Sequence, residues 1–191
     1  MQRGVRMGQH NKTALVTGAS RGIGRATALA LAETGAHVLV HYGRSAPEAE
    51  SLVSEIQTKG GSANEISVDL GTPNGAALLA KQVRSIVGDR LDVLVLNAGI
   101  SKAARIADYT VEDFDNLFAT NVRSPFFLVQ QLLPVLGERS NIVLVSSATA
   151  RTVGASPVWK TLRSLPTPLL REQLKLWLST GPPFSGRAAY A

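Results

Sequence analysis

A glycine-rich stretch decides the fold of this chain, and it reads Thr17-Gly18-Ala19-Ser20-Arg21-Gly22-Ile23-Gly24. It follows an apolar run over 14–17 that is typical of a buried parallel strand, and it opens a segment over 23–32 with helical periodicity. Gly18 permits a tight turn, while Gly22 and Gly24 let the backbone approach a pyrophosphate and let the helix pack on the sheet. The helix N-terminus then offers N–H groups and a positive dipole end to phosphate. The stretch predicts a dinucleotide-binding turn; the alternative is a structural turn without a ligand.

Strands and helices alternate over the chain from residue 13 to residue 146. Hydrophobic patterns predict strands at 14–17, 37–41, 63–68, 92–96 and 141–145, and helices at 23–32, 47–59, 75–87 and 111–136. Thr110 is the expected N-cap of the last helix, with Asp113 at position N3. The predicted fold class is therefore α/β, with a Rossmann-type doubly wound parallel sheet, helices on both faces and strand order 3-2-1-4-5.

Four further motifs follow the glycine-rich turn in a fixed order. They are Val68-Asp69-Leu70, Asn97-Ala98-Gly99, Asn121-Val122 and the run from Ile142 to Ser147. Together with the Gly-x-x-x-Gly-x-Gly spacing of the turn, they resemble the short-chain dehydrogenase/reductase family, and the match to its bacterial 3-oxoacyl-carrier-protein reductases is close. The resemblance covers about residues 12–157.

The resemblance implies a role for each motif. The cofactor-binding residues that it implies are Gly18, Ser20, Arg21, Gly22, Ile23, Gly24, Arg44, Asp69, Leu70, Asn97, Ala98 and Gly99. It also implies that Asp69 contacts the adenine, that Asn121 holds a water of the proton relay and that Ser147 donates to the substrate carbonyl. Taken alone, Asp69 is a helix cap, Asn97 to Gly99 a β-turn and Ser147 a turn residue. Asn121 lies within the predicted helix, where Asn lowers helix propensity, and this favours a hydrogen-bonding role over packing.

The end of the second predicted strand indicates the cofactor. A carboxylate at this position would bind the ribose 2′-OH and select NAD. The sequence has His41-Tyr42-Gly43-Arg44-Ser45 instead, so Arg44 and Arg21 are expected to meet a 2′-phosphate. We predict NADP(H), with NAD less favoured; the alternative is that Arg44 is a solvated loop charge.

The family pattern breaks after Pro157. The family's Tyr-x-x-x-Lys motif is absent from the 191 residues, although Ala189-Tyr190-Ala191 resembles the usual context of its Tyr. Either residues 158–191 are out-of-frame or foreign sequence, which we favour, or an inserted segment precedes Tyr190 as the true catalytic Tyr. In both cases the Lys, the helix that carries it and the last strands of the family's fold are missing. We expect an N-terminal tail over 1–11, a dinucleotide-binding domain over 12–157 and an atypical tail over 158–191.

The missing helix has a consequence for the predicted sheet. Without it, Val143 and Val145 are expected to lack cover on one face, and the fifth strand is expected to be an exposed edge. We therefore expect a marginally stable, aggregation-prone product.

Composition limits the partners. The formal net charge is +6, but residues 158–191 carry five basic residues and one acidic residue, and no nucleic-acid-binding motif appears. Nucleic acid is therefore not expected as a partner. The absence of cysteine excludes disulfides and thiolate metal sites and favours a cytoplasmic location. No apolar run is long enough to span a bilayer, and His10, His37 and His41 are interpreted as ordinary surface or core residues rather than metal ligands.

Three hypotheses about function result. The first is an NADP(H)-dependent oxidoreductase that transfers hydride between a carbonyl and an alcohol of a small molecule, with Asn121, Ser147 and Tyr190 as its catalytic residues. The second is a catalytically inactive NADP(H)-binding remnant, and the third is an interaction protein that acts through its basic tail. The resemblance also implies a homodimer or homotetramer for the parent family.

Overall fold

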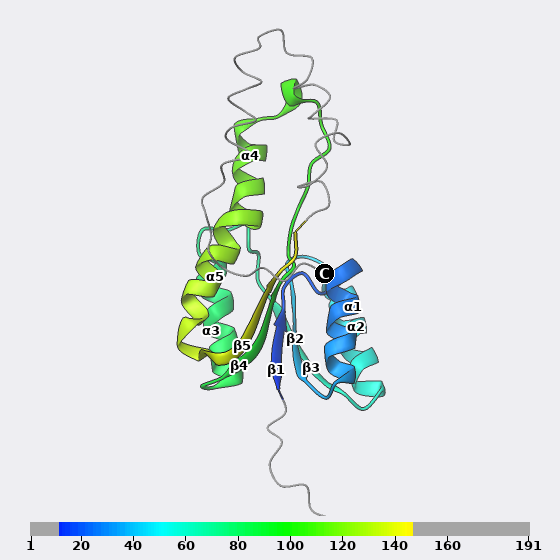
Figure 1. Ribbon diagram of the computed structural model, residues 1–191. Coiled ribbons are helices and arrows are strands. Elements are labelled where there is room, and N and C mark those ends of the chain that lie inside the picture. The colour runs from blue at the N-terminus through cyan, green and yellow to red at the C-terminus, as the bar shows by residue number, and fades with distance from the viewer. Residues whose placement is uncertain (1–11, 147–191) are drawn as a thin grey trace, which may run out of the picture. The chain divides into compact units, whose positions relative to one another are not determined.

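Five parallel strands form the centre of the computed structural model, which describes residues 12–146 of the chain (Figure 1). The strands are β1 (Thr13–Val16), β2 (His37–Tyr42), β3 (Ser62–Ser67), β4 (Leu91–Leu96) and β5 (Leu136–Leu144). Their order is β3-β2-β1-β4-β5, and every neighbouring pair is parallel. The predicted α/β class and the strand order 3-2-1-4-5 are confirmed.

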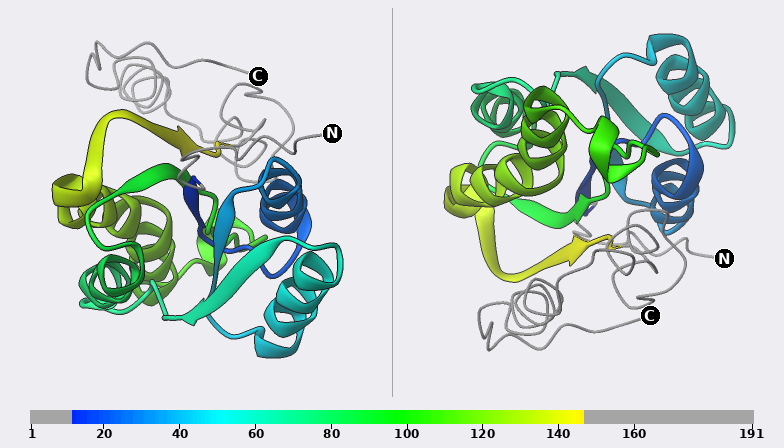
Figure 2. Two further views of the ribbon diagram at one scale, coloured as in Figure 1. Left: turned by 90° about the horizontal axis from the view of Figure 1, so that it is seen from below. Right: turned by 90° about the horizontal axis from the view of Figure 1, so that it is seen from above.

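Helices cover both faces of this sheet. They are α1 (Gly22–Glu33), α2 (Ala46–Thr58), α3 (Gly75–Val87), α4 (Val111–Phe118) and α5 (Ser124–Leu132). Figure 2 shows α1 and α2 on one face and α3 and α5 on the other. All these elements belong to one compact unit, formed within the described part by residues 12–102 and 110–146. Residues 103–109 belong to a second unit, in which Ile106–Asp108 form a 3₁₀ turn.

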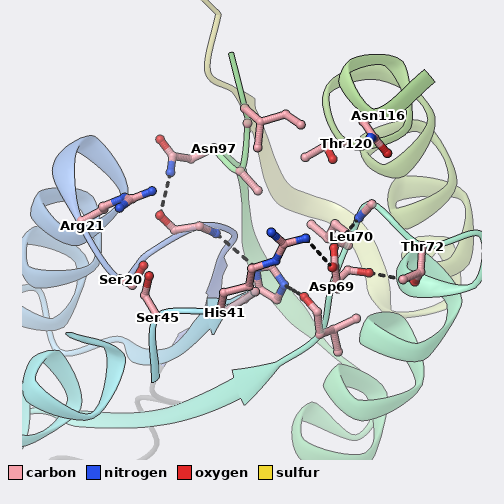
Figure 3. A pocket seen from close by; sticks show the side chains of 18 of the residues that line it. Ser20, Arg21, His41, Ser45, Asp69, Leu70, Thr72, Asn97, Asn116 and Thr120 are labelled. Atoms are coloured by element: carbon pink, nitrogen blue, oxygen red, sulfur yellow. Dashed lines mark hydrogen bonds and ion pairs between the residues drawn. The ribbon is translucent and has the colours of Figure 1, made fainter. Parts of the chain in front are cut away.

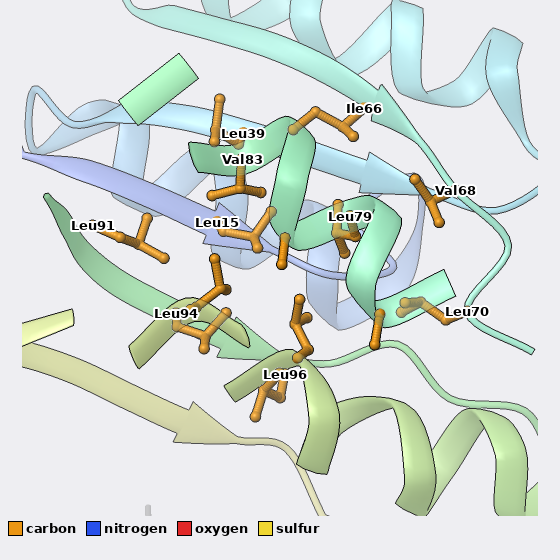
Figure 4. Packing of buried hydrophobic residues seen from close by; sticks show 14 of the residues in the cluster. Leu15, Leu39, Ile66, Val68, Leu70, Leu79, Val83, Leu91, Leu94 and Leu96 are labelled. Atoms are coloured by element: carbon orange, nitrogen blue, oxygen red, sulfur yellow. The ribbon is translucent and has the colours of Figure 1, made fainter. Parts of the chain in front are cut away.

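The inner strands β1, β2 and β4 are largely apolar on both faces because helices cover each face. Leu15, Leu39 and Leu94 pack into one cluster with Leu79 of α3 and Leu128 of α5 (Figure 4). The side chains between them along the strands point to the opposite face, as the period of two requires. These residues, Val16, Val38, Val40 and Val95, pack with Ala28 of α1 and Leu52 of α2.

Local signals place most of the helix ends. Gly35 has φ +87° just after α1, and Gly60 has φ +82° just after α2, the conformation that favours glycine after a helix. Thr110 and Asp113 form the predicted cap of α4: the Asp113 amide donates to Thr110 Oγ1 at 3.1 Å, and the Thr110 amide donates to Asp113 Oδ2 at 3.0 Å. This reciprocal pair satisfies two backbone donors at the start of α4.

The prediction of one helix over 111–136 is wrong. A π-helical turn over Ala119–Arg123 separates α4 from α5, and α5 ends at Leu132. Pro125 accounts for the π turn, because it has no N–H and its ring crowds the carbonyl four residues earlier. Pro134 lies in the 3₁₀ turn Leu133–Val135 and ends the helix for the same reason.

The fifth strand begins earlier than predicted, at Leu136 instead of residue 141. Leu136 pairs with Leu91 and Asn141 with Val93, so the register is irregular between these pairs. Ser140 Oγ donates to the Leu91 carbonyl at 2.5 Å within this irregular part.

β5 is an edge of the sheet formed by the described residues. Val143 is 48% exposed, as the sequence led us to expect, and its neighbour Leu144 is 65% exposed. Val145, which was expected to lack cover, is instead partly buried against the cluster on the α1 and α2 face.

Candidate functional site

A cleft of about 750 Å³ lies at the carboxyl ends of β1, β2, β3 and β4 (Figure 3). Ligands bind at this edge in open α/β sheets, and the volume is in the ordinary range for small-molecule sites. The lining contains every predicted cofactor-binding residue except Gly22 and Gly24: Gly18, Ser20, Arg21, Ile23, Arg44, Asp69, Leu70, Asn97, Ala98 and Gly99. The sequence motifs, up to 81 residues apart, are thus brought together around one cavity.

The three glycines of the turn serve different geometric needs. Gly18 has φ +64°, and a Cβ placed on it would lie 2.8 Å from the Cα of Ala98. A Cβ on Gly24 would collide with the Gly18 carbonyl and would lie 2.5 Å from Asn97 Nδ2. Gly22 has φ +59° and no atom within 4 Å of the corresponding position. Gly24 is therefore needed for packing behind the turn, whereas Gly22 needs only its backbone conformation.

Thr17 organises the start of the turn, a role that the sequence did not suggest. Its buried hydroxyl donates to the Val95 carbonyl at 3.2 Å and accepts from the amides of Asn97 at 2.9 Å and Ala98 at 3.0 Å. The carboxyl ends of β1 and β4 are fixed to each other by these bonds. The available signal was a hydroxyl at the end of an otherwise apolar strand.

The Asn97 side chain holds the same turn from the β4 side. Its Nδ2 donates to the carbonyl of Thr17 at 3.0 Å and to that of Gly18 at 3.1 Å; Figure 3 shows Asn97 above the turn. Asn97 thus positions the glycine-rich turn, and its contact with a cofactor stays a prediction.

His41 holds the turn from the β2 side. Its side chain is buried, and its Nδ1 lies 3.1 Å from the Gly18 amide, while its Nε2 lies 3.0 Å from the Val68 carbonyl. Burial lowers the pKa of His41 to about 4, against the smaller opposing effects of the Val68 carbonyl and the Asp69 charge. The interpretation of His41 as an ordinary surface or core residue missed these contacts.

The electrostatics of the cleft favour an anion. Arg21 is the N-cap of α1, and no acidic residue lies in the first turn of that helix. Arg44 is largely exposed, and its Nη2 lies 3.4 Å from Asp69 Oδ2. A pair this exposed contributes little free energy, so the Arg44 guanidinium can turn toward a phosphate at small cost. Asp69 also accepts from the Gly71 amide at 2.8 Å.

Asn121 lies in the π-helical turn and pairs with the backbone of the loop after β4. Its Oδ1 accepts from the Ile100 amide and its Nδ2 donates to the Ile100 carbonyl, both at 2.9 Å. The predicted hydrogen-bonding role is confirmed, while its part in a proton relay stays a prediction. Arg123 and Ser124 also anchor this turn, through the carbonyls of Gly71 and Leu70.

A second contact joins the loop after β4 to the start of α4. Lys102 Nζ lies 2.5 Å from Asp113 Oδ2. This ammonium, together with the backbone and side-chain bonds to Thr110, lowers the pKa of Asp113 to about 2. The carboxylate therefore serves the helix cap and the ion pair at once.

Two of the predicted catalytic residues, Ser147 and Tyr190, lie outside the described residues, as does the tail over 158–191. Among residues 12–146, no group of three His, Asp or Glu side chains could hold a metal ion. In the same part of the chain, no helix is long and apolar enough to cross a membrane.

Comparison with known families agrees with this geometry. The model of the family described as short chain dehydrogenase matches residues 12–158. This chain belongs to the short-chain dehydrogenase family. Among curated relatives of this family, versicolorin reductase stcU of Emericella nidulans is 41% identical over 143 residues, which are 75% of this chain and 54% of the relative. The 3-oxoacyl-[acyl-carrier-protein] reductase FabG of Staphylococcus aureus is 39% identical over 144 residues, 58% of its length.

Solved structures of short-chain dehydrogenases share the fold. The angucycline C-6 ketoreductase LanV, solved with bound NADP, superposes with a TM-score of 0.72 at 37% identity, over 88% of this chain and 66% of that chain. A short chain dehydrogenase from Burkholderia cenocepacia in complex with NADP gives a TM-score of 0.73 at 35% identity, over 87% and 65%. The chain spans about half the length of the curated relatives it matches.

Proposed function

We propose that this chain binds NADP(H) in the cleft at the carboxyl ends of β1 to β4, and that the bound cofactor serves reduction of a small-molecule carbonyl. The observation that carries the proposal is the charge around the end of β2. Arg44 and Arg21 line the cleft there, and the segment from His41 to Ser45 contains no carboxylate that would bind a ribose 2′-OH.

The cleft residues fit each part of the nucleotide. The first turn of α1 presents backbone N–H groups and no competing carboxylate, which suits a pyrophosphate. The open space beside Gly22 leaves room for its approach. Asp69 and Leu70 line the same cleft and are proposed to hold the adenine, and the two guanidinium groups suit a 2′-phosphate. The NADP complexes of related dehydrogenases support the same assignment.

The roles of individual residues in the reaction are proposed from the family resemblance. When bound, NADPH supplies the hydride that reduces the carbonyl carbon. Asn121, held against Ile100, is proposed to position a water of the proton relay. Ser147 is proposed to donate to the carbonyl oxygen and Tyr190 to act as the acid, both on the resemblance alone.

A titration of the 191-residue chain tests the proposal. NADPH should raise the melting temperature at concentrations where NADH has little effect, because a ligand at a hundred times its Kd stabilises a protein by about 2.7 kcal/mol. Equal responses to the two cofactors would reject the role of the arginines. No response to either would reject the site.

A second candidate is nucleotide binding without turnover by this chain. It is favoured by one observation, the absence of Tyr-x-x-x-Lys from the 191 residues. Loss of NADPH absorbance with a panel of ketones separates the two candidates. Turnover of any ketone would exclude the second candidate, and binding without turnover would support it.

A further inference from the structure

The strongest unassigned feature is the buried imidazole of His41 beneath the glycine-rich turn. His41 is the next-to-last residue of β2, it is 2% exposed, and both of its ring nitrogens are within hydrogen-bond distance of backbone atoms. It lines the cleft together with Gly18 and Val68, which lie at the carboxyl ends of β1 and β3 (Figure 3). The ring therefore connects the ends of three neighbouring strands.

The two partners fix the proton on this ring. A backbone amide can only donate, so Nδ1 must be unprotonated to accept from Gly18 at 3.1 Å. A carbonyl can only accept, so Nε2 must carry the proton that it donates to Val68 at 3.0 Å. Among the forms of imidazole, the neutral Nε2–H tautomer alone satisfies both contacts.

His41 and Asn97 hold the same peptide groups from opposite sides. The His41 ring binds the Gly18 amide, and the His41 backbone carbonyl accepts from the Ala19 amide at 2.8 Å. Asn97 Nδ2 binds the carbonyls of Thr17 and Gly18. The amides of Gly18 and Ala19 are thus already paired with His41. The donors left for a phosphate are those of the first turn of α1.

We propose that His41 is a positioning residue for nucleotide binding: its neutral imidazole holds the Gly18 amide and so presets the turn that presents the α1 N-terminus to a phosphate. This inference rests on the proposed function, because the ligand is the same NADP(H). It assigns to His41 an effect on affinity that acts through Gly18, without contact between the ring and the cofactor.

The surroundings of His41 keep the ring neutral. Asp69, at the end of β3, favours protonation of the ring, whereas Arg44 and Arg21, from the β2–α2 loop and the turn, carry positive charges in the same cleft. Burial outweighs the Asp69 charge and holds the pKa of His41 at about 4. Between about pH 5 and pH 8, protonation of His41 should therefore not change the affinity for the nucleotide.

Three variants of the full chain test the inference. His41→Leu fills the space without an acceptor, and should weaken NADPH binding about tenfold, since it leaves a buried amide unpaired. His41→Asn places an oxygen near the Nδ1 position and should restore most of the affinity. His37→Leu is the matched control on the same strand, because His37 contacts Ser62 at the opposite end of β2 and should leave NADPH binding unchanged.

A purely structural role predicts a different pattern. In that case His41→Leu would lower the melting temperature but leave the NADPH affinity of the folded chain unaltered, and this result would overturn the inference. Failure of His41→Asn to restore affinity would also overturn it.

A spectrum of the unmodified chain decides the matter even if the variants do not fold. Long-range ¹H–¹⁵N NMR correlations distinguish the neutral Nε2–H tautomer from the Nδ1–H tautomer and from the cation. The Nε2–H pattern at pH 7, assigned to His41 by its absence from the His41→Asn spectrum or by sequential assignment, supports the inference. A protonated Nδ1 overturns it. Because this measurement needs no nucleotide, a chain that fails to bind NADPH would contradict the proposed function while the spectrum still judges His41.

Discussion

At the scale of single residues, His41 makes the free energy of unfolding depend on pH, mostly above the range in which carboxylates with lowered pKa values contribute. Its pKa is about 4 in the folded chain against an ordinary value of 6.5. Below pH 6.5 the unfolded chain binds a proton that the folded chain does not. The free energy of unfolding should therefore decrease as the pH falls from 6.5 toward 4, by roughly 2 kcal/mol at pH 5.

Urea unfolding at pH 7, 6 and 5 measures this dependence. His41→Asn removes the titrating group and should flatten the curve over that range. Asp113, whose pKa is lowered to about 2, loses its contribution only below its ordinary value of 3.8, so it does not interfere. An identical slope in the two chains would contradict the assignment to His41.

Arg44 provides the test of cofactor selection at this scale. Arg44→Asp removes the guanidinium and places a carboxylate where NAD-selecting proteins carry one. NADPH affinity should fall about ten- to hundredfold, since a charge-assisted contact is lost, and NADH affinity should be maintained or increased. Isothermal titration with both cofactors gives the ratio.

The matched control for that charge reversal is Arg139→Asp. Arg139 is exposed and is not among the residues that line the cleft. It changes the net charge by the same amount, so an equal loss of NADPH affinity in both variants would assign the effect to long-range electrostatics instead of Arg44.

The sequence predicted which residues meet at the cleft better than it predicted their contacts. Arg44, Asp69 and Asn97 were placed at strand ends, and parallel strands bring their carboxyl ends to one edge, so their proximity was predictable. The roles of Thr17 and His41 were not, because each depends on hydrogen bonds to backbone atoms of another strand. The order of residue types along the chain does not indicate which backbone atoms of another strand a side chain will contact. Asn121 is intermediate: the cost of Asn in a helix indicated a hydrogen bond but did not indicate Ile100.

At the scale of elements, glycine is required around α1 for two different reasons. Gly22 and Gly35 need a backbone with positive φ, whereas Gly24 needs the absence of a side chain. Gly22 and Gly35 both have positive φ with no neighbouring atom in the way. Alanine at either position should destabilise the fold by a similar amount, about 1 kcal/mol, through backbone strain alone. Only Gly22→Ala is predicted to weaken NADPH binding as well, because Gly22 belongs to the turn that is proposed to hold the pyrophosphate, whereas Gly35 follows the far end of α1.

Gly24→Ala is expected to behave differently from both. Its Cβ meets the Gly18 carbonyl and Asn97 Nδ2, and α1 would have to move away from the turn. Overpacking typically costs roughly 1–3 kcal/mol, so Gly24→Ala should lower the free energy of unfolding more than the other two variants do. The melting temperatures of the three variants, measured side by side, check this order of stability. A Gly24→Ala chain as stable as Gly35→Ala would show that α1 adjusts freely.

The cap of α4 is a further test at this scale. Thr110→Ala removes the acceptor for the Asp113 amide and should cost about 1 kcal/mol of unfolding free energy. Thr110→Ser keeps the hydroxyl and should retain most of the stability. Chemical denaturation measures the difference, and equal losses in the two variants would show that the methyl group, not the hydroxyl, matters.

Element types were predictable because hydrophobic periodicity reports which faces are covered. The helix boundaries after residue 111 were not predictable from periodicity, since the pattern of apolar residues continues through the π turn and past Leu132. The two prolines, Pro125 and Pro134, were the local signals that the single-helix prediction ignored. The start of β5 at Leu136 depends on pairing with Leu91, a partner that no local pattern indicates.

At the scale of the whole molecule, the strands of the sheet differ in how far they are covered from solvent. The inner strands β1, β2 and β4 are covered on both faces by buried clusters. β5, in contrast, is the edge strand of the described sheet and exposes Ile142, Val143 and Leu144 in succession. Consecutive apolar side chains on an edge strand favour pairing with other chains.

Aggregation through β5 is therefore the expected failure of this chain on heating or storage. Leu144 is 65% exposed, so Leu144→Lys should change the free energy of unfolding by only about 0.5 kcal/mol while a charge at the edge opposes strand pairing. The matched control is Ile86→Lys, which introduces the same charge at a 45% exposed apolar residue that belongs to the helix α3 and not to a strand. Light scattering at constant protein concentration should rise more slowly for Leu144→Lys alone. If both variants slow aggregation equally, net charge is the cause and the edge of β5 is not the site of association.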